Sequence, residues 1–217
     1  MKIVREVAVV GSLVGVSGLV GCSTPTASEE LARVVGSVKA GQVAVIDVRE
    51  FSRITDADLA QLDGLAGLVE LNLDTAPITD AGLERIKGLT GLKSLSLSET
   101  AVSDLGVERL VGLTNLEFLR MDRTRVTDAG LVHVAKLPRL KRLSLWKVYV
   151  TDAGVGPLTA LTKLESLSLD ETRITDAGLR KLAALKNLKQ LSVWSTRVTD
   201  AGVAEFQEVV PGCKVNR

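Results

Sequence analysis

Aromatic residues are scarce in this 217-residue chain, which has two tryptophans, one tyrosine and three phenylalanines. Hydrophobic residues nevertheless make up 46% of the sequence and charged residues 24%, so the chain is too apolar to be disordered. The core of the fold must therefore be built mainly from aliphatic side chains. The position of each aromatic residue then needs its own explanation.

Histidine and cysteine are also nearly absent, and this limits the available chemistry. His133 is the single histidine, and the two cysteines are Cys22 and Cys213. No Cys/His spacing is typical of a zinc site, and no glycine-rich loop is typical of phosphate binding. We expect a solvated His133 and a Cys213 packed near the C-terminus. The sequence predicts no catalytic residue, no metal and no cofactor, and thus a protein that is not an enzyme.

Neither sign of charge is in excess. The chain has 27 basic and 26 acidic residues, and without the first 21 residues, which include Lys2, Arg5 and Glu6, it has 25 of each. Binding to nucleic acid needs a surplus of Lys and Arg to contact phosphates. The balance therefore argues against nucleic acid as the main partner and leaves protein and glycan partners open.

No hydrophobic run has the roughly 20 residues that a membrane-spanning helix needs. The apolar stretch from Val7 to Val20 is shorter and follows the basic residues Lys2 and Arg5. This arrangement is typical of a secretory signal that is removed from the mature protein. We therefore exclude the segment from the predicted fold.

The end of this segment, Leu19-Val20-Gly21-Cys22, resembles the bacterial lipobox. The resemblance implies a signal peptide at 1–21, cleavage before Cys22, a diacylglycerol on the Cys22 sulfur, and a short tether within 22–27. An ordinary secretory signal with a cysteine nearby is the alternative. We expect an exported protein anchored by lipid to the cell membrane or outer membrane, facing the periplasm or the exterior. Ser23, where an Asp often retains lipoproteins at the inner membrane, weakly favours the outer membrane.

A motif of the form Thr-Asp-Ala-Gly recurs along the rest of the chain at a fixed period of 24 residues. The seven copies are ITDADL (54–59), ITDAGL (78–83), VSDLGV (102–107), VTDAGL (126–131), VTDAGV (150–155), ITDAGL (174–179) and VTDAGV (198–203). Between them runs an equally regular series of leucines. Such self-similarity is typical of a solenoid, in which each unit buries its apolar face against its neighbours.

The repeat resembles the bacterial leucine-rich repeat of the TDAGL type, with Thr at most positions where other repeats have Asn. The resemblance implies an α/β solenoid with a curved parallel sheet on its concave face, short helices on its convex face and an N-terminal helical cap. We expect the cap helix and first strand at 28–48, with that strand one residue out of register. Repeats are expected at 49–210 and a final cap strand at 211–217.

The polar residues of the motif have a structural explanation. Thr79 and its equivalents precede apolar helical segments and are expected to act as N-caps, while Asp80 and its equivalents favour the positive end of the helix dipole. Calcium binding is the alternative for the repeated Asp residues, but calcium loops gather several oxygen ligands, and each turn here offers one. The Thr column at 100, 124, 172 and 196 is expected to satisfy backbone groups of the loops.

The outward-facing strand positions vary from repeat to repeat, and they hold the candidate binding residues. Both tryptophans fall in one such column, about 10 Å apart at the usual strand spacing. Exposed aromatic rings beside arginines are typical of binding hot spots. The predicted partner-binding residues are Phe118, Arg120, Asp122, Arg142, Trp146, Tyr149, Asp170 and Trp194. We expect the arginines at 125, 173 and 197 to form a solvated edge.

The sequence thus predicts a lipid-anchored, non-catalytic module that binds a protein partner through its concave face. A glycan-binding module, with the paired tryptophans stacked on sugars of the cell wall, is the first alternative. A purely structural envelope protein is the second. We expect a monomer. The identity of the partner rests on analogy with other repeat proteins, because one fold supports many partners.

Overall fold

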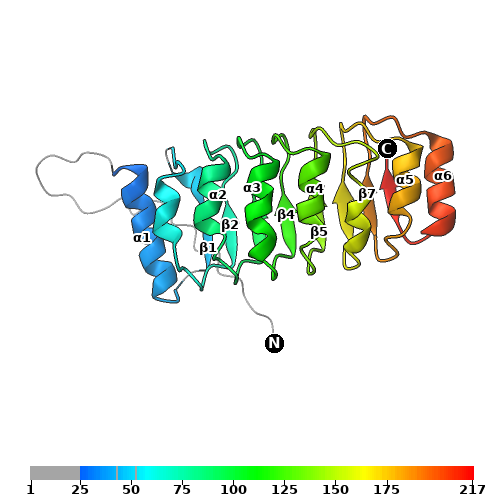
Figure 1. Ribbon diagram of the computed structural model, residues 1–217. Helices are drawn as coiled ribbons and strands as arrows, with labels where there is room; N and C mark the ends of the chain where they lie inside the picture. The colour runs from blue at the N-terminus through cyan, green and yellow to red at the C-terminus, as the bar shows by residue number, and fades with distance from the viewer. Residues whose placement is uncertain (1–24, 43, 52) are drawn as a thin grey trace, which may run out of the picture.

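The computed structural model describes residues 25–217 except residues 43 and 52. The predicted signal peptide at 1–21 and the predicted lipidation site at Cys22 lie outside the described residues. Within them, the chain forms one row of repeats that share a single sheet and a single core (Figure 1).

Eight parallel strands form the sheet, and they are ordered as they occur in the sequence. They are β1 (Val45–Asp47), β2 (Glu70–Asn72), β3 (Ser94–Ser96), β4 (Phe118–Arg120), β5 (Arg142–Ser144), β6 (Ser166–Ser168), β7 (Gln190–Ser192) and β8 (Lys214–Asn216). From β2 onward, each residue pairs with the residue 24 positions later, as in Glu70 with Ser94. Val45 instead pairs with Glu70, so β1 is one residue out of register, as the sequence predicts.

Short helices cover one face of the sheet, which we call the helix face, and leave the other, the sheet face, uncovered by helices (Figure 1). The α-helices are α1 (Ala27–Lys39), α2 (Asp80–Ile86), α3 (Asp104–Arg109), α4 (Asp128–Val134), α5 (Asp176–Leu182) and α6 (Asp200–Val209). Single 3₁₀ turns are η1 (Val48–Glu50), η2 (Asp58–Leu62), η3 (Leu110–Gly112) and η4 (Pro157–Ala160). In the fifth copy of the motif, Pro157 begins η4, and this 3₁₀ turn stands where other copies have an α-helix.

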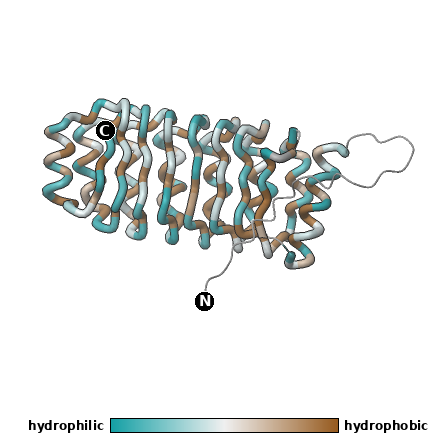
Figure 2. The backbone as a smooth tube through the Cα atoms, turned by 180° about the vertical axis from the view of Figure 1, so that it is seen from behind, coloured by the Kyte–Doolittle hydropathy of each residue, from teal (hydrophilic) through white to brown (hydrophobic). Residues whose placement is uncertain are grey.

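The core is aliphatic and continuous from α1 to the C-terminal turn. In strands β1 to β7 the central residue, such as Leu71, Leu95 or Leu119, is buried while its neighbours face outward, because side chains alternate along a strand. Hydrophobic stretches therefore recur once per repeat along the backbone (Figure 2). Truncating one of these leucines to Ala is expected to cost about 2–5 kcal/mol.

The Asp of the motif begins the helix in five of the copies, as predicted, and in six of the seven copies it has a further role between repeats. Asp104 is the first residue of α3, and its carboxylate extends to the next repeat. Its Oδ1 accepts a hydrogen bond from the Thr127 N–H at 2.8 Å, and its Oδ2 accepts one from the Thr127 hydroxyl at 2.6 Å. The same pair of bonds recurs in five further places: Asp56 with Thr79, Asp80 with Ser103, Asp128 with Thr151, Asp152 with Thr175, and Asp176 with Thr199. Each Asp thus forms a rung to the start of the following repeat.

The Gly of the motif makes room for this rung. A Cβ placed on Gly130 would lie 2.4 Å from Asp104 Oδ1, and one on Gly106 would lie 2.4 Å from Asp80 Oδ1. The Gly130 N–H also donates to Asp104 at 2.9 Å. Neighbouring repeats therefore stack closely at this glycine, because the carboxylate of the preceding repeat fills the space that a side chain would need.

The hydroxyl residues satisfy backbone groups within their own repeats. Thr79 and Thr127 accept hydrogen bonds from the backbone N–H two residues later and act as N-caps, whereas Ser103 makes no such bond. In the other Thr column, Thr100 donates to the Leu97 carbonyl at 2.6 Å, and Thr172 donates to the Leu169 carbonyl at 2.6 Å. These bonds hold the turn that follows each strand.

The two ends of the array differ from its middle. In the first copy Asp58 takes the Gly position, and its carboxylate accepts hydrogen bonds from the Thr55 N–H at 2.9 Å and the Thr55 hydroxyl at 2.8 Å. Asp58 thus does what a preceding repeat's Asp would do. In the last copy Asp200 pairs with Arg217. The side chain of Asp200 is 92% exposed.

Candidate binding face

The eight predicted binding residues lie on the sheet face or on the turns that follow strands β4 to β7. Phe118, Arg120 and Arg142 belong to strands, and Asp122, Trp146, Asp170 and Trp194 lie two residues after a strand. Tyr149 lies farther along, where its backbone forms an isolated bridge with Thr127. The predicted residues therefore divide between the sheet face and the loop edge, by which we mean the residues 123, 125, 147, 149, 173 and 197 after the strands.

Trp146 is half-buried and held in place on both sides. The Arg123 guanidinium lies 4.2 Å from the centre of its ring. The Trp146 Nε1–H donates a hydrogen bond to Glu171 Oε1 at 3.0 Å. This bond, with smaller contributions from Lys147 and Arg123, lowers the pKa of Glu171. The ring is therefore fixed before any partner arrives.

Trp194 is more open than Trp146, since 57% of its surface is exposed. Its backbone N–H donates to Asp170 Oδ1 at 2.7 Å, and Ser168 donates to the other oxygen at 2.9 Å. Asp170 thus fixes the turn that presents the Trp194 ring.

Asp122 has the corresponding role two repeats earlier, and it is buried. It accepts hydrogen bonds from the Trp146 N–H at 3.0 Å, the Ser144 hydroxyl at 2.6 Å and the Arg120 Nε–H at 2.7 Å. The Asp122 bond is the main reason that the pKa of Arg120 is raised. Asp122 and Asp170 therefore position the tryptophan-bearing turns.

Two further aromatic rings are stacked under arginines. The Arg142 guanidinium lies 4.9 Å from the centre of the Phe118 ring on the sheet face. The Arg173 guanidinium lies 5.8 Å from the centre of the Tyr149 ring on the loop edge, and Tyr149 is 64% exposed. Cation–π contacts of this kind hold an arginine without neutralising its charge.

The sequence did not indicate a polar depression near the N-terminal end of the sheet face. Its volume is about 300 Å³, and Asp47, Arg49, Ser94, Phe118 and Arg120 are among the residues that line it. Small outward residues on β3, flanked by large ones on β2 and β4, leave this space. That contrast in side-chain size was visible in the sequence and is the signal that could have revealed the depression.

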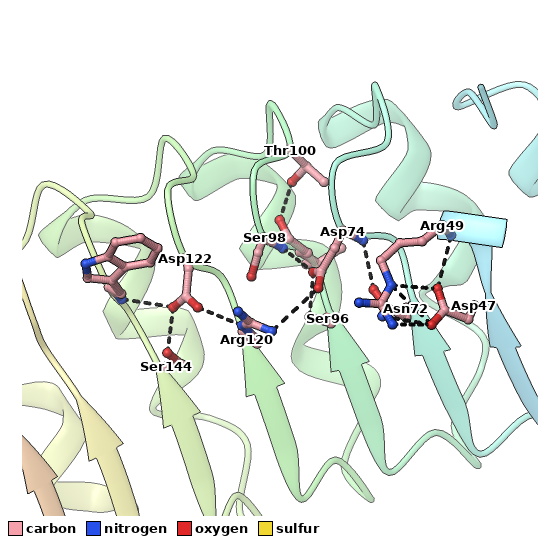
Figure 3. Close-up of polar contacts among 12 residues, drawn as sticks. Asp47, Arg49, Asn72, Asp74, Ser96, Ser98, Thr100, Arg120, Asp122 and Ser144 are labelled. Atoms are coloured by element: carbon pink, nitrogen blue, oxygen red, sulfur yellow. Dashed lines mark hydrogen bonds and ion pairs between the residues drawn. The ribbon is translucent and has the colours of Figure 1, made fainter. Parts of the chain in front are cut away.

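A row of hydrogen bonds along the strand ends forms the rim of the depression (Figure 3). Asp47 accepts bonds from Arg49, Asn72 accepts one from the Asp74 N–H at 2.9 Å, and Asp74 accepts one from Ser96 at 2.5 Å. Arg120 lies between Asp74 and Asp122. The Arg49 guanidinium is the main cause of the lowered pKa of Asp47. The charges of this rim are largely paired with one another.

The single histidine, His133, and the cysteine of the described residues, Cys213, are the remaining candidates for catalysis or metal binding. Cys213 is buried, as predicted, and burial raises the pKa of its thiol to about 11. His133 differs from its prediction, because it is half-buried and its Nδ1 is covered and lacks a hydrogen-bond partner in the described part of the chain. Among the described residues, no three His, Cys, Asp or Glu side chains gather as a metal site would require. None of the described helices has the length and hydrophobicity needed to cross a membrane.

Known proteins with the same architecture are leucine-rich-repeat proteins. A family model described as "Leucine Rich repeat" matches residues 160–183. An internalin C2 from Listeria monocytogenes is similar in structure, with a TM-score of 0.62 and 22% identity over 91% of this chain and 99% of that one. Another internalin from Listeria monocytogenes has a TM-score of 0.60 and 17% identity, and the match covers 84% of this chain and 56% of that one. No curated protein sequence matches the chain. The chain therefore has the leucine-rich-repeat fold that its sequence predicts.

Proposed function

We propose that this chain is an exported, lipid-anchored module that binds a protein partner through its sheet face and does not catalyse a reaction. The observation that carries the proposal is the exposed ring of Trp194 and the fixed ring of Trp146, which occupy the same position two repeats apart. Both rings are held on turns that aspartates anchor by hydrogen bonds. Rings fixed in advance lose little conformational entropy on binding, and aromatic and arginine side chains dominate the energetics of many interfaces.

Two features support the proposed site over other surfaces. The sheet face is free of helices, and its outward residues differ from repeat to repeat while the core residues do not. A surface column that the fold does not constrain is free to be specific for a partner. Export and anchoring rest on the lipobox resemblance at Leu19-Val20-Gly21-Cys22 and on the signal-like segment before it.

A capture experiment tests the binding proposal. The tagged full-length chain serves as bait for a solubilised envelope fraction and for growth medium, and the variant W146A/W194A runs beside it. We expect a protein that the native chain captures and the variant does not. The matched control is F51A, which changes an aromatic residue that packs against the core away from the proposed site. Each variant is first shown to have native circular dichroism.

The possible results separate the alternatives. Equal capture by the native chain and W146A/W194A would reject the tryptophan site. Release of the captured material by soluble cell-wall fragments would favour the glycan-binding alternative. The absence of any captured partner would favour a structural role in the envelope. The anchor is tested separately by labelling with a radioactive fatty acid, and label that persists in C22S would reject lipidation at Cys22.

A further inference from the structure

The charges of the array are segregated along its length, although they cancel overall. Residues 25–120 contain 15 acidic and 9 basic residues, a net charge of −6. Residues 121–217 contain 10 acidic and 16 basic residues, a net charge of +6. Both tryptophans lie in the second part. A partner of this part therefore approaches a positive field, even though the chain is neutral as a whole.

The loop edge of the positive part carries a column of exposed arginines. Arg125, Arg173 and Arg197 occupy the same position in three repeats, and Tyr149 occupies it in the repeat after Arg125. Short parallel bridges hold the column in register, and the Arg125 and Arg173 N–H groups each donate at 2.9 Å to a carbonyl of the preceding repeat. Neighbouring repeats are about 4.8 Å apart at the usual strand spacing. The column is thus a rigid row of side chains.

These three arginines differ from the basic residues beside them. Arg123 pairs with Glu99 at 3.2 Å, and Lys147 pairs with Glu171 at 3.4 Å. Within the described residues, Arg125, Arg173 and Arg197 have no carboxylate oxygen within 4.0 Å. Arg173 stacks over the Tyr149 ring, and this contact leaves its charge unpaired by any carboxylate of the described residues.

Acidic residues close to the column in sequence have other partners; Glu171, two residues before Arg173, pairs with Lys147. Asp128 and Asp176 each follow a column arginine by three residues. Their carboxylates accept hydrogen bonds from the N–H and hydroxyl groups of Thr151 and Thr199. These carboxylates form the rungs between repeats. The guanidinium groups of the column therefore remain available to an outside anion.

We propose that the partner presents an acidic polypeptide segment that docks along this column, with its carboxylates on Arg125, Arg173 and Arg197. This inference rests on the proposed function and names the chemistry of its partner. Arginine binds carboxylates through two parallel hydrogen bonds, and the exposed ring of Tyr149 supplies apolar contact at the same edge. A polypeptide fits better than a phosphate polymer, because it can pack apolar groups on this ring while its carboxylates bind the arginines.

A peptide-binding titration tests the inference. The probe is a fluorescent dodecapeptide in which Glu alternates with Gly, and its anisotropy is followed as the full-length chain in detergent is added at low salt. We expect binding that weakens as salt is added and that falls roughly tenfold in R125E/R173E/R197E, as the loss of three exposed ion pairs implies. The conservative variant R125K/R173K/R197K should retain part of the affinity, because the charge stays while the bidentate geometry is lost.

A variant with the same change in net charge is the matched control. K93E/K136E/K163E alters three exposed lysines that lie outside the loop edge and have no ion pair within the described residues. Its affinity for the peptide should change less than threefold. Equal weakening in both triple variants would mean that net charge alone attracts the peptide, and this would overturn the inference. So would the absence of peptide binding by the native chain.

Two further probes decide the chemical class of the partner. Inorganic polyphosphate and phosphatidylglycerol vesicles are titrated at the same anionic charge as the peptide. Tighter column-dependent binding of either would overturn the polypeptide assignment. The result is separable from the proposed function: capture that depends on the tryptophans but not on R125E/R173E/R197E would sustain the sheet-face function and reject the acidic partner.

Discussion

Replacing Asp104 with alanine tests whether the rungs between repeats stabilise the array. The carboxylate accepts three hydrogen bonds from the next repeat, two from Thr127 and one from the Gly130 N–H, at 2.6–2.9 Å. A hydrogen bond to a charged group contributes about 1.5–3 kcal/mol, but three bonds that share one carboxylate are not additive. Because the side chain is half-buried, we expect D104A to lower the free energy of unfolding by about 3 kcal/mol.

Asp200 provides the matched control for this prediction. It begins α6 as Asp104 begins α3, so both carboxylates have the same favourable position at a helix N-terminus. Asp200 makes no bond to another copy of the motif within the described residues, and its side chain is 92% exposed and paired with Arg217. We therefore expect D200A to lower the free energy of unfolding by less than about 1 kcal/mol. D104N, which keeps one oxygen as an acceptor, should fall between the two.

The measurement is urea unfolding followed by far-ultraviolet circular dichroism, with tryptophan fluorescence as a second probe. Coincident transitions from the two probes allow the free energies to be compared directly. A large loss in D104A with a small loss in D200A supports the rung. Equal losses would refute this reasoning, because they would show that the carboxylate acts through the dipole of its own helix.

Further predictions concern the glycine, the thiol, acid stability and the tryptophans. G130A should lower the free energy of unfolding by about 2–3 kcal/mol in urea titrations, because its Cβ would lie 2.4 Å from Asp104 Oδ1. G88A is the control, and it should change this free energy little because its Cβ would meet nothing within 4 Å. Burial raises the pKa of Cys213 to about 11, so in a C22S background Ellman's reagent at pH 8 should label the native chain far more slowly than the urea-unfolded chain. The Thr199 N–H, and to a smaller extent the Thr199 hydroxyl, lowers the pKa of Asp176 below 3.8. The resulting stabilisation is present above pH 3.8 and is lost as the pH falls through the lowered pKa. The free energy of unfolding of D176N should therefore fall less steeply with decreasing pH in the acid range than that of the native chain. W194F, which retains half-buried Trp146, should emit at shorter wavelength and be quenched less by acrylamide than W146F, and the reverse order would contradict the exposures found.

The sequence was sufficient to predict the solenoid, because its evidence is periodic. The 24-residue spacing of the motif predicted the strand register, and the irregular start of the first strand predicted the shift that pairs Val45 with Glu70. In the fifth copy, Pro157 begins a 3₁₀ turn in place of an α-helix, because proline restricts the backbone there. Each of these features follows from local backbone preferences and from alternation of buried and exposed residues.

The role of the motif's Asp could not be assigned from one repeat at a time. An Asp at the first helical position satisfies the helix dipole of its own repeat, and this explanation is complete without any neighbour. The bond from Asp104 to Thr127 exists only when two repeats are stacked. The signal was nevertheless present, because the first copy has Asp58 where the others have Gly. With no repeat before it, Thr55 needs a carboxylate from its own repeat.

The candidate site was less predictable than the fold, because it depends on pairing between neighbouring columns. Trp146 and Trp194 occupy the same column, yet one is held by Arg123 and Glu171 and the other is open. Asp122 and Asp170 were predicted as binding residues, and the structure shows that they hold backbone N–H groups of the tryptophans. The exposure of a side chain in a repeat protein is set by what the two adjacent repeats place beside it.

The same argument points to the arginine column as a surface that the fold does not need. In this array the core leucines repeat because they pack, and the Asp and Thr residues repeat because they form rungs. Charged residues such as Arg123 and Lys147 have partners in a neighbouring repeat. Arg125, Arg173 and Arg197 recur at the period of the fold and yet contribute no ion pair within the described residues. Their regular spacing is provided by the scaffold, and their charge is left for a partner outside it.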